Sequence, residues 1–192
     1  MLRTNVFAQR GALLAVPAAA LSALGKPSAF SIAVGLPLAF AGEALRMWAV
    51  GYSGVTTRGD KVTAPALVTA GPYAYVRNPL YVGNFLTAAG FAYAFTGRNS
   101  APVRFALVTG SLALMFGVYA VIVPHEEEYL RETFGDQFDD YARRVPPVVP
   151  LLEPSEPQTG SYDPEVIAKA ESRTFLTFGA MLAALALKAL RA

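Results

Sequence analysis

One polar loop, residues 71–83, carries the side chains of this 192-residue chain that are best suited to hold a ligand. It contains three tyrosines, one arginine and one asparagine, and it leads into a charge-free apolar run over residues 80–96. Two prolines restrict its backbone, and a glycine at each end permits conformations that other residues resist. Such a rigid loop can bind an anionic or aromatic group. The alternative is a plain interfacial turn with an aromatic belt.

Acidic residues gather in the second half of the chain, where twelve of the fourteen lie after position 125. They begin with three glutamates, 126–128, directly after His125. Apolar side chains recur every three or four positions between residues 126 and 144, which predicts an amphipathic helix. Its acidic first turn and its closing pair, Arg143 and Arg144, agree with the helix dipole. A solvated acidic turn is the alternative reading of the glutamates.

The composition predicts an all-α integral membrane protein. Of its residues, 54% are apolar and 16% are charged, whereas soluble domains have about 25% charged residues. The absence of cysteine and the single histidine exclude disulfides, thiolate metal sites and multi-histidine metal centres. A formal net charge of +2, without a basic run, does not indicate a nucleic-acid partner. We therefore expect neither a metal nor a nucleic acid.

Five apolar runs predict about five transmembrane helices, although the first and last are short for a span of about 20 residues. A cleaved signal peptide is the alternative for the first run, and a helix lying on the membrane surface is the alternative for the last. The fourth run is expected to end at Pro124, because proline interrupts a helix. The runs cover residues 11–24, 29–50, 80–96, 105–123 and 174–187.

These runs suggest three parts of the chain. Residues 1–50 form an N-terminal transmembrane hairpin, and residues 51–152 form a core with the polar loop, two spans and the amphipathic helix. Residues 153–192 hold a linker and the last helix, whose start is predicted at Asp163-Pro164.

Two ionisable residues lie within the second apolar run. Glu43 and Arg46 are three residues apart on one helix face and can form an ion pair. Ionisable side chains at membrane depth usually face a cavity or the interior of the bundle. The alternative is that both lie at the membrane interface, beside Trp48 and Tyr52.

The distribution of basic residues orients the spans. If five helices cross the membrane and the N-terminus is cytoplasmic, eleven basic residues fall on the inner side and five on the outer side, as the positive-inside rule requires. The polar loop and the acidic helix then share the cytoplasmic face. The inner residues are Arg3, Arg10, Arg46, Arg58, Lys61, Arg77, Arg131, Arg143, Arg144, Lys169 and Arg173, and the outer ones are Lys26, Arg98, Arg104, Lys188 and Arg191.

Two segments resemble one known family. Residues 71–83 read Gly-Pro-Tyr-x-Tyr-Val-Arg-Asn-Pro-x-Tyr-x-Gly, which is similar to the GPYxxVRHPxYxG segment of the isoprenylcysteine carboxyl methyltransferase family. That family is related to the integral-membrane phospholipid methyltransferases. Residues 126–146 resemble the same family's EExxLxxxFGxxYxxYxxxVP segment. The resemblance covers roughly residues 35–150.

The resemblance implies methyl transfer from S-adenosylmethionine. Arg77 or the backbone of its loop would hold the carboxylate of the cofactor, and Glu126 or Glu127 its ammonium or ribose hydroxyls. The tyrosines would pack on the adenine or the sulfonium. The implied cofactor-binding residues are Tyr73, Tyr75, Val76, Arg77, Asn78, Pro79, Tyr81, Gly83, His125, Glu126, Glu127 and Leu130.

The methyl acceptor implied by the resemblance is amphipathic and enters from the lipid. An isoprenylcysteine carboxylate is favoured, while a phospholipid amine and a small thiol or carboxylate stay open. Arg77, Asn78, Arg144 and Arg46 are candidate catalytic residues, and Arg46, Arg143 and Arg144 are candidates to meet an acceptor carboxylate. The oligomeric state is left undetermined by the sequence.

The chain departs from the family pattern at two positions. Asn78 stands where the family usually has histidine, and Phe138 where it often has tyrosine. An amide can imitate one nitrogen of a neutral imidazole but cannot titrate, so a proton-accepting function would fall to His125 or be lost. Two alternative functions stay open. One is a membrane reductase of the sterol-reductase type with a nicotinamide cofactor, and the other is a non-catalytic transporter subunit or scaffold.

Overall fold

The described part of the chain forms helices joined by turns and loops. The computed structural model describes residues 2–54 and 64–191, and of residues 2–10 only the side chain of Gln9. Arg58, Asp60 and Lys61, and the side chains of Arg3 and Arg10, therefore lie outside the described residues. The elements are α1 (Leu2–Leu24), α2 (Ala29–Ser53), the 3₁₀ helix η2 (Gly71–Ala74), α3 (Pro79–Phe95), α4 (Ala101–Phe134), α5 (Asp136–Arg144) and α6 (Glu165–Leu190).

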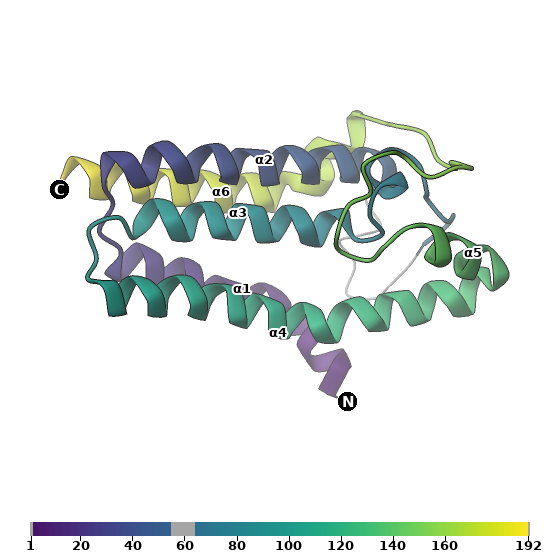
Figure 1. Ribbon diagram of the computed structural model, residues 1–192, viewed down its shortest axis with the longest axis horizontal. Helices are drawn as coiled ribbons and strands as arrows, with labels where there is room; N and C mark the ends of the chain where they lie inside the picture. Colours follow the sequence, from purple (N-terminus) through teal and green to yellow (C-terminus); the bar gives the residue numbers. More distant parts are fainter. Residues whose placement is uncertain (1, 55–63, 192) are drawn as a thin grey trace.

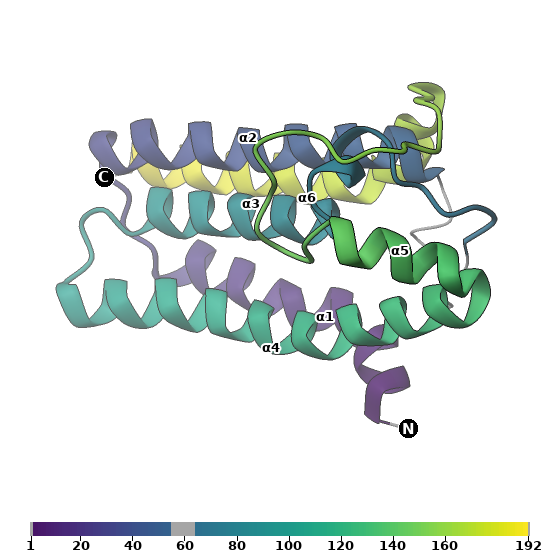
Figure 2. The same ribbon diagram turned by 45° about the vertical axis from the view of Figure 1, so that its right-hand side comes forward.

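The long helices lie in two layers. One layer contains α2, α3 and α6, and the other contains α1 and α4 (Figures 1 and 2). Consecutive long helices run in opposite directions, so η2, α5 and the linker before α6 gather at one end of the bundle (Figure 1). The α1–α2 and α3–α4 turns and the end of α6 lie at the other end. The prediction that the polar loop and the acidic segment share one end is confirmed.

The apolar runs are helical, as predicted, and the chain is a membrane protein. Among the described residues, three helices are long and apolar enough to cross a bilayer: Ala29–Ser53, Ala101–Phe134 and Glu165–Leu190. The apolar part of α1, Gly11–Leu24, is shorter. Helix α3 has 17 residues, about 25 Å at 1.5 Å per residue, against about 30 Å of hydrocarbon.

The prediction that the fourth apolar run ends at Pro124 is wrong. Helix α4 continues through this proline to Phe134. Proline removes a single backbone donor, and a long helix with bonded turns on both sides tolerates that loss. The helix ends instead at Gly135, whose φ of 53° favours glycine. The acidic segment is therefore a rigid extension of α4 followed by the short helix α5, not one separate amphipathic helix.

Local chemistry explains where the other helices begin. At the start of α2, the Ser28 hydroxyl accepts a hydrogen bond from the Ser31 backbone N–H at 3.1 Å, and the Ser31 hydroxyl accepts one from the Ser28 backbone N–H at 3.0 Å, which together form a capping box. Helix α6 begins as predicted, because Asp163 Oδ1 accepts the backbone N–H of Glu165 at 2.9 Å. Pro79 occupies the first position of α3, where its missing N–H costs nothing.

Helices α2 and α3 pack backbone against backbone. A Cβ atom added to Gly90 would lie 2.4 Å from the Ala39 nitrogen and 2.6 Å from the Gly35 carbonyl oxygen. One added to Gly42 would lie 2.5 Å from the Gly83 carbonyl oxygen. Small residues at such crossings let membrane helices approach closely. The pair forms a stiff frame that holds both Arg46 and the loop before α3.

We predict that Gly90→Ala destabilises the protein by about 1–3 kcal/mol, because the added methyl group forces two backbones apart. Titration with dodecyl sulfate in mixed micelles, followed by circular dichroism, measures the free energy of unfolding. Gly117→Ala on α4 is the matched control, since a Cβ there meets nothing within 4 Å. Equal losses in the two variants would contradict the close-packing account.

Candidate functional site

A large cavity lies between the helices. Its volume is about 1140 Å³, and residues of α1, α2, α3, α4, α6 and the 71–78 loop line it. Its lining is polar near the loop and near Glu126, and apolar between α1, α4 and α6. The apolar lining includes Leu14, Ala18, Leu21, Phe91, Met115, Phe178 and Met181.

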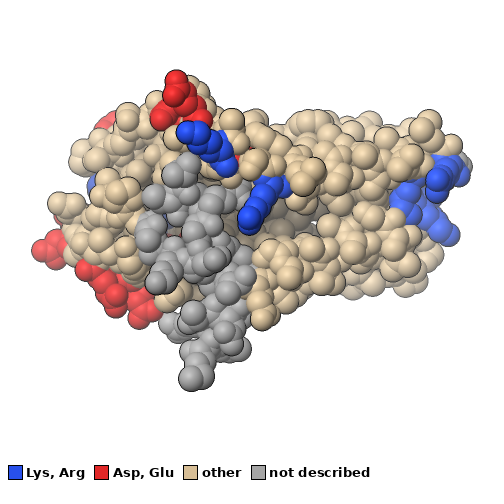
Figure 3. Space-filling view, turned by 180° about the vertical axis from the view of Figure 1, so that it is seen from behind, with Lys and Arg blue, Asp and Glu red and all other residues tan. Residues whose placement is uncertain are grey.

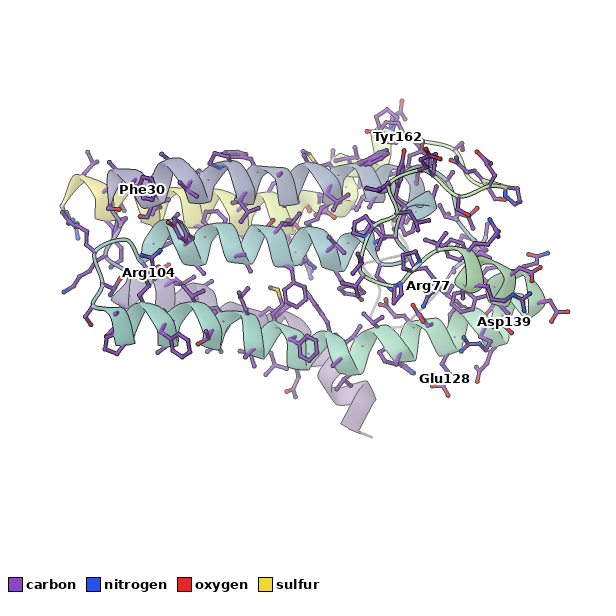
Figure 4. The ribbon with its side chains drawn as sticks, viewed as in Figure 1. Phe30, Arg77, Arg104, Glu128, Asp139 and Tyr162 are labelled. Carbon is purple, nitrogen blue, oxygen red and sulfur yellow. The ribbon has the colours of Figure 1, made fainter. Side chains whose placement is uncertain are left out.

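Arg77 joins three segments at the polar end of this cavity, where Figure 4 shows it between the loop, α4 and α5. Its Nε and Nη2 donate to the two carboxylate oxygens of Glu127 at 3.0 and 3.1 Å. Its Nη1 donates to the carbonyl oxygens of Ala142 at 2.9 Å and Val145 at 2.7 Å. Two of the residues expected to hold the cofactor, Arg77 and Glu127, are thus bonded to each other. These bonds clamp the loop against α4 and α5.

Asn78 extends the same clamp. Its amide nitrogen donates to Glu127 Oε1 at 3.1 Å and to the Pro147 carbonyl oxygen at 3.1 Å. A neutral imidazole has one N–H donor, whereas the amide has two. The amide therefore satisfies two acceptors at once, and this position acts here as a hydrogen-bond donor, for which no titration is needed.

Glu126 and two tyrosines present polar groups to the cavity. The Tyr81 hydroxyl donates to Glu126 Oε1 at 2.7 Å, and both residues line the cavity. Tyr73 also lines it, and burial raises the pKa of Tyr73 to about 12. Burial also raises the pKa of Tyr141, whose hydroxyl donates to the Tyr73 carbonyl oxygen at 2.8 Å. At neutral pH these phenols are protonated, so they serve as donors and ring surfaces and not as bases.

A buried ionic network forms the wall of the cavity deeper in the bundle. Arg46 Nη2 donates to both carboxylate oxygens of Glu171 on α6, at 3.0 and 2.8 Å. Its Nε lies 3.6 Å from Glu43 Oε2, so the predicted ion pair is confirmed. Arg46 also donates to Asn84 on α3, which in turn donates to the Tyr119 hydroxyl of α4 at 2.7 Å. Because Glu43, Arg46 and Glu171 are all buried, the prediction of an interior location holds over the interfacial alternative.

Several predicted residues lie away from the described cavity lining. Tyr75 packs on Trp48 with ring centroids 6.2 Å apart, and Val76 is buried beneath the loop. Gly83 lies against α2, where an added Cβ would be 2.7 Å from the Gly42 carbonyl oxygen. Its requirement for glycine therefore comes from helix packing.

His125 and Arg144 are also not among the described residues that line the cavity. Arg144 is exposed and donates to the Ser155 hydroxyl at 2.9 Å and to the Glu156 carbonyl oxygen, so it fastens the linker before α6. His125 is half-buried on α4. Pro79 and Leu130, by contrast, are among the residues that line the cavity.

Sequence reasoning missed the contribution of α6 and of Asn84. Glu171 lies three residues before the last apolar run and is fully buried, and Thr174, Lys169 and Arg173 of the same helix line the cavity. A carboxylate so close to an apolar run was a usable signal, since ionisable residues at membrane depth tend to face the bundle interior. Its partner, 125 residues earlier, could not be deduced from spacing.

Comparison with known protein families shows to which family the chain belongs. Residues 30–137, more than half of the sequence, match the family model described as phospholipid methyltransferase. The chain belongs to this family. The matched region contains the 71–83 loop with Arg77 and Asn78, and it contains Glu126 and Glu127, whereas α6 lies beyond it.

Curated relatives are similar over part of their length. Protein-S-isoprenylcysteine O-methyltransferase of Schizosaccharomyces pombe is 37% identical over 86 residues, which are 45% of this chain and 34% of that protein. Protein-S-isoprenylcysteine O-methyltransferase B of Arabidopsis thaliana is 34% identical over 122 residues, 62% of this chain and 58% of that protein.

A bacterial relative carries a different name. The nickel-cobalt-cadmium resistance protein NccN of Alcaligenes xylosoxydans xylosoxydans is 37% identical over 108 residues, 56% of this chain and 44% of that protein. The chain thus spans between about a third and three fifths of the length of these three relatives. No solved structure matches it.

The buried network predicts that substitutions of Arg46 and of Glu171 destabilise the protein by different amounts. Arg46→Gln leaves two carboxylates buried without their cation, and we expect a loss of about 3–5 kcal/mol in the free energy of unfolding. Glu171→Gln leaves Arg46 beside Glu43 and is expected to cost less, about 1–3 kcal/mol. Dodecyl sulfate titration of the two variants measures both values, and a larger loss in Glu171→Gln would refute this assignment of the network.

Proposed function

We propose that the chain transfers a methyl group from S-adenosylmethionine to an amphipathic acceptor that enters the cavity from the membrane. One observation carries the proposal. The two segments that resemble methyltransferase motifs meet at one cavity, where Tyr81 donates to Glu126 and Arg77 to Glu127. Family membership and the names of the isoprenylcysteine methyltransferase relatives support the same reaction.

The polar end of the cavity fits the proposed cofactor. Bound S-adenosylmethionine supplies a methyl group activated by its sulfonium. Glu126 is the carboxylate placed to hold its ammonium or ribose hydroxyls, because Glu127 is engaged by Arg77 and Asn78. The Tyr73 and Tyr81 rings offer faces to the adenine or the sulfonium. Ligand pockets usually measure about 300–1000 Å³, so the cavity has room for the cofactor and part of an acceptor.

Methyl transfer is a direct displacement that depends on alignment of the two reactants and on exclusion of water. The clamp formed by Arg77, Asn78 and Glu127 supplies the alignment, because it fixes the loop that lines the cofactor end. A carboxylate acceptor is already a nucleophile and needs no base. Asn78 is therefore compatible with activity, and Arg77 and Asn78 act as positioning residues.

One face of α6 supports an amphipathic acceptor with an anionic head. Lys169, Arg173, Thr177 and Met181 follow at four-residue intervals and all line the cavity. Over about 18 Å of helix, this stripe changes from basic through polar to apolar. Figure 3 shows basic side chains beside a hollow on this face of the molecule. An acceptor with its head at the basic end would place its tail between α1, α4 and α6.

We propose this stripe in place of the three arginines first expected to meet the acceptor. Arg46 is engaged by Glu171 and Asn84, Arg143 by Asp140 and Arg144 by the linker. An isoprenylcysteine carboxylate is the acceptor we favour, because it combines a single apolar tail with a carboxylate and because the relatives are named for that substrate.

We also propose that all five long helices cross the membrane, with the N-terminus and the cofactor end in the cytoplasm. The alternating directions of the helices and the excess of basic residues assigned to that side support this orientation. The shorter α3 can span if the bilayer thins locally or its flanking side chains reach outward.

Calorimetry with S-adenosylhomocysteine tests the cofactor site. The detergent-purified protein is expected to bind it, and Glu126→Gln is expected to weaken binding about tenfold by removing a charge-assisted hydrogen bond. Glu128→Gln is the matched control, because Glu128 is exposed and points away from the loop (Figure 4). Folded wild-type protein that does not bind would refute the proposal, and binding of a nicotinamide cofactor instead would favour the reductase alternative.

Steady-state kinetics test the acceptor assignment. With N-acetyl-S-farnesylcysteine as acceptor, the double variant Lys169→Gln/Arg173→Gln is expected to raise KM about tenfold. Its kcat and its affinity for S-adenosylhomocysteine should be unchanged. Arg143→Gln removes a cation at the same end of the molecule, outside the cavity, and should have no effect. An unchanged KM in the double variant would contradict an acceptor head at α6.

A further inference from the structure

A second cavity, of about 500 Å³, lies at the other end of the bundle, away from the candidate active site. Three parts of the chain line it: the end of α1 with the α1–α2 turn, the α3–α4 turn, and the last turns of α6. Four of its nine lining residues are basic, and no described lining residue is acidic. The basic residues are Lys26, Arg98, Lys188 and Arg191.

The basic residues at this end of the bundle are concentrated around the cavity. By the orientation proposed above, five basic residues lie at this end, and four of them surround one small cavity. Figure 3 shows Lys and Arg side chains gathered at one end of the molecule. Like charges held this close repel one another, and a bound anion would convert that repulsion into attraction.

The two turns hold the cations in place. The Arg98 backbone N–H donates to the Lys26 carbonyl oxygen at 2.7 Å, and the Lys26 backbone N–H donates to Asn99 Oδ1 at 2.8 Å. Asn99 also donates to the Leu24 carbonyl oxygen at 3.0 Å. Backbone and amide bonds thus join the turns and do not depend on the basic side chains. The basic side chains therefore line the cavity from a pre-formed frame.

Lys188 already has a structural function. Its ammonium donates to the carbonyl oxygens of Ala23 and Gly25, each at 3.0 Å, where the end of α1 leaves backbone acceptors exposed. The other three basic residues do not fill that function. They surround the space beside it together with the Ser22 hydroxyl.

We propose that this cavity binds the phosphate of an anionic membrane lipid. The remaining wall supports a lipid over a free phosphate ion, because Ala184 and Leu187 of α6 give it an apolar side on which an acyl chain can lie. Basic pockets between transmembrane helices at the membrane boundary bind anionic headgroups in this way. A lipid here fastens the end of α6 to the α1–α2 turn. The proposal does not depend on the methyltransferase reaction.

Native mass spectrometry of the full chain tests this site. The protein in dodecylmaltoside is offered phosphatidylglycerol or phosphatidylcholine with the same acyl chains. We expect wild-type protein to retain phosphatidylglycerol preferentially, and Arg98→Gln/Arg191→Gln to retain about tenfold less, since each lost cation removes a charge-assisted contact. Lys188 is left intact because it also holds the end of α1.

The matched control, Arg104→Gln/Arg143→Gln, removes the same number of positive charges. Arg104 lies over the Tyr93 ring, 4.7 Å from its centroid, and neither residue lines the cavity. This variant should retain phosphatidylglycerol as the wild type does. Equal loss in both double variants, or no preference for phosphatidylglycerol in the wild type, would overturn the proposal.

A second experiment distinguishes binding of the lipid from binding of free phosphate. Thermal unfolding is followed with phosphatidylglycerol or with inorganic phosphate at equal concentration. Stabilisation by the lipid alone, absent in Arg98→Gln/Arg191→Gln, is the expected result. Stabilisation by inorganic phosphate alone would overturn the assignment to a lipid.

Discussion

The candidate site depends on the guanidinium of Arg77. It bonds Glu127 on α4 and the carbonyl groups at the end of α5, while its own backbone N–H donates to the Pro146 carbonyl oxygen at 2.9 Å. These partners lie 50 to 69 residues later in the chain, counted from Arg77. An arginine this buried is stable only when its donors are satisfied. The observed arrangement of the loop, α4 and α5 meets that requirement, and it forms the polar end of the cavity.

A second constraint comes from charge inside the bundle. Glu43, Arg46 and Glu171 are buried within the bundle, so their opposite charges stabilise one another. Their network ties α2 to α6, and Asn84 and Tyr119 extend it to α3 and α4. Since Arg46 is bonded to these partners, the acceptor carboxylate of the proposed reaction would have to be bound elsewhere. The basic side chains of α6 at the cavity rim are the groups placed to do so.

Helix α6 gives this chain features that its family relationship does not supply. The family match ends at residue 137, yet α6 contributes one wall of the large cavity and part of the basic cavity at the opposite end. Its polarity changes along one face, from Lys169 to Met181. Under the proposed function, a helix of this kind would align an amphipathic acceptor with the membrane while the matched region holds the cofactor. Substrate preference and lipid dependence in this chain would then both be properties of α6.

The sequence by itself determined the membrane class, the helical runs, the Glu43–Arg46 pair and the meeting of the loop with the acidic segment. Each follows from local hydrophobicity, helix periodicity or the short hairpin between the two segments. Only the tertiary structure decided that α4 continues through Pro124, because the stability of the flanking turns and not proline alone sets the helix end. It also decided that Arg77 pairs with Glu127 and Arg46 with Glu171. Which oppositely charged groups meet depends on how helices distant in the sequence pack, and no spacing along the chain encodes that choice.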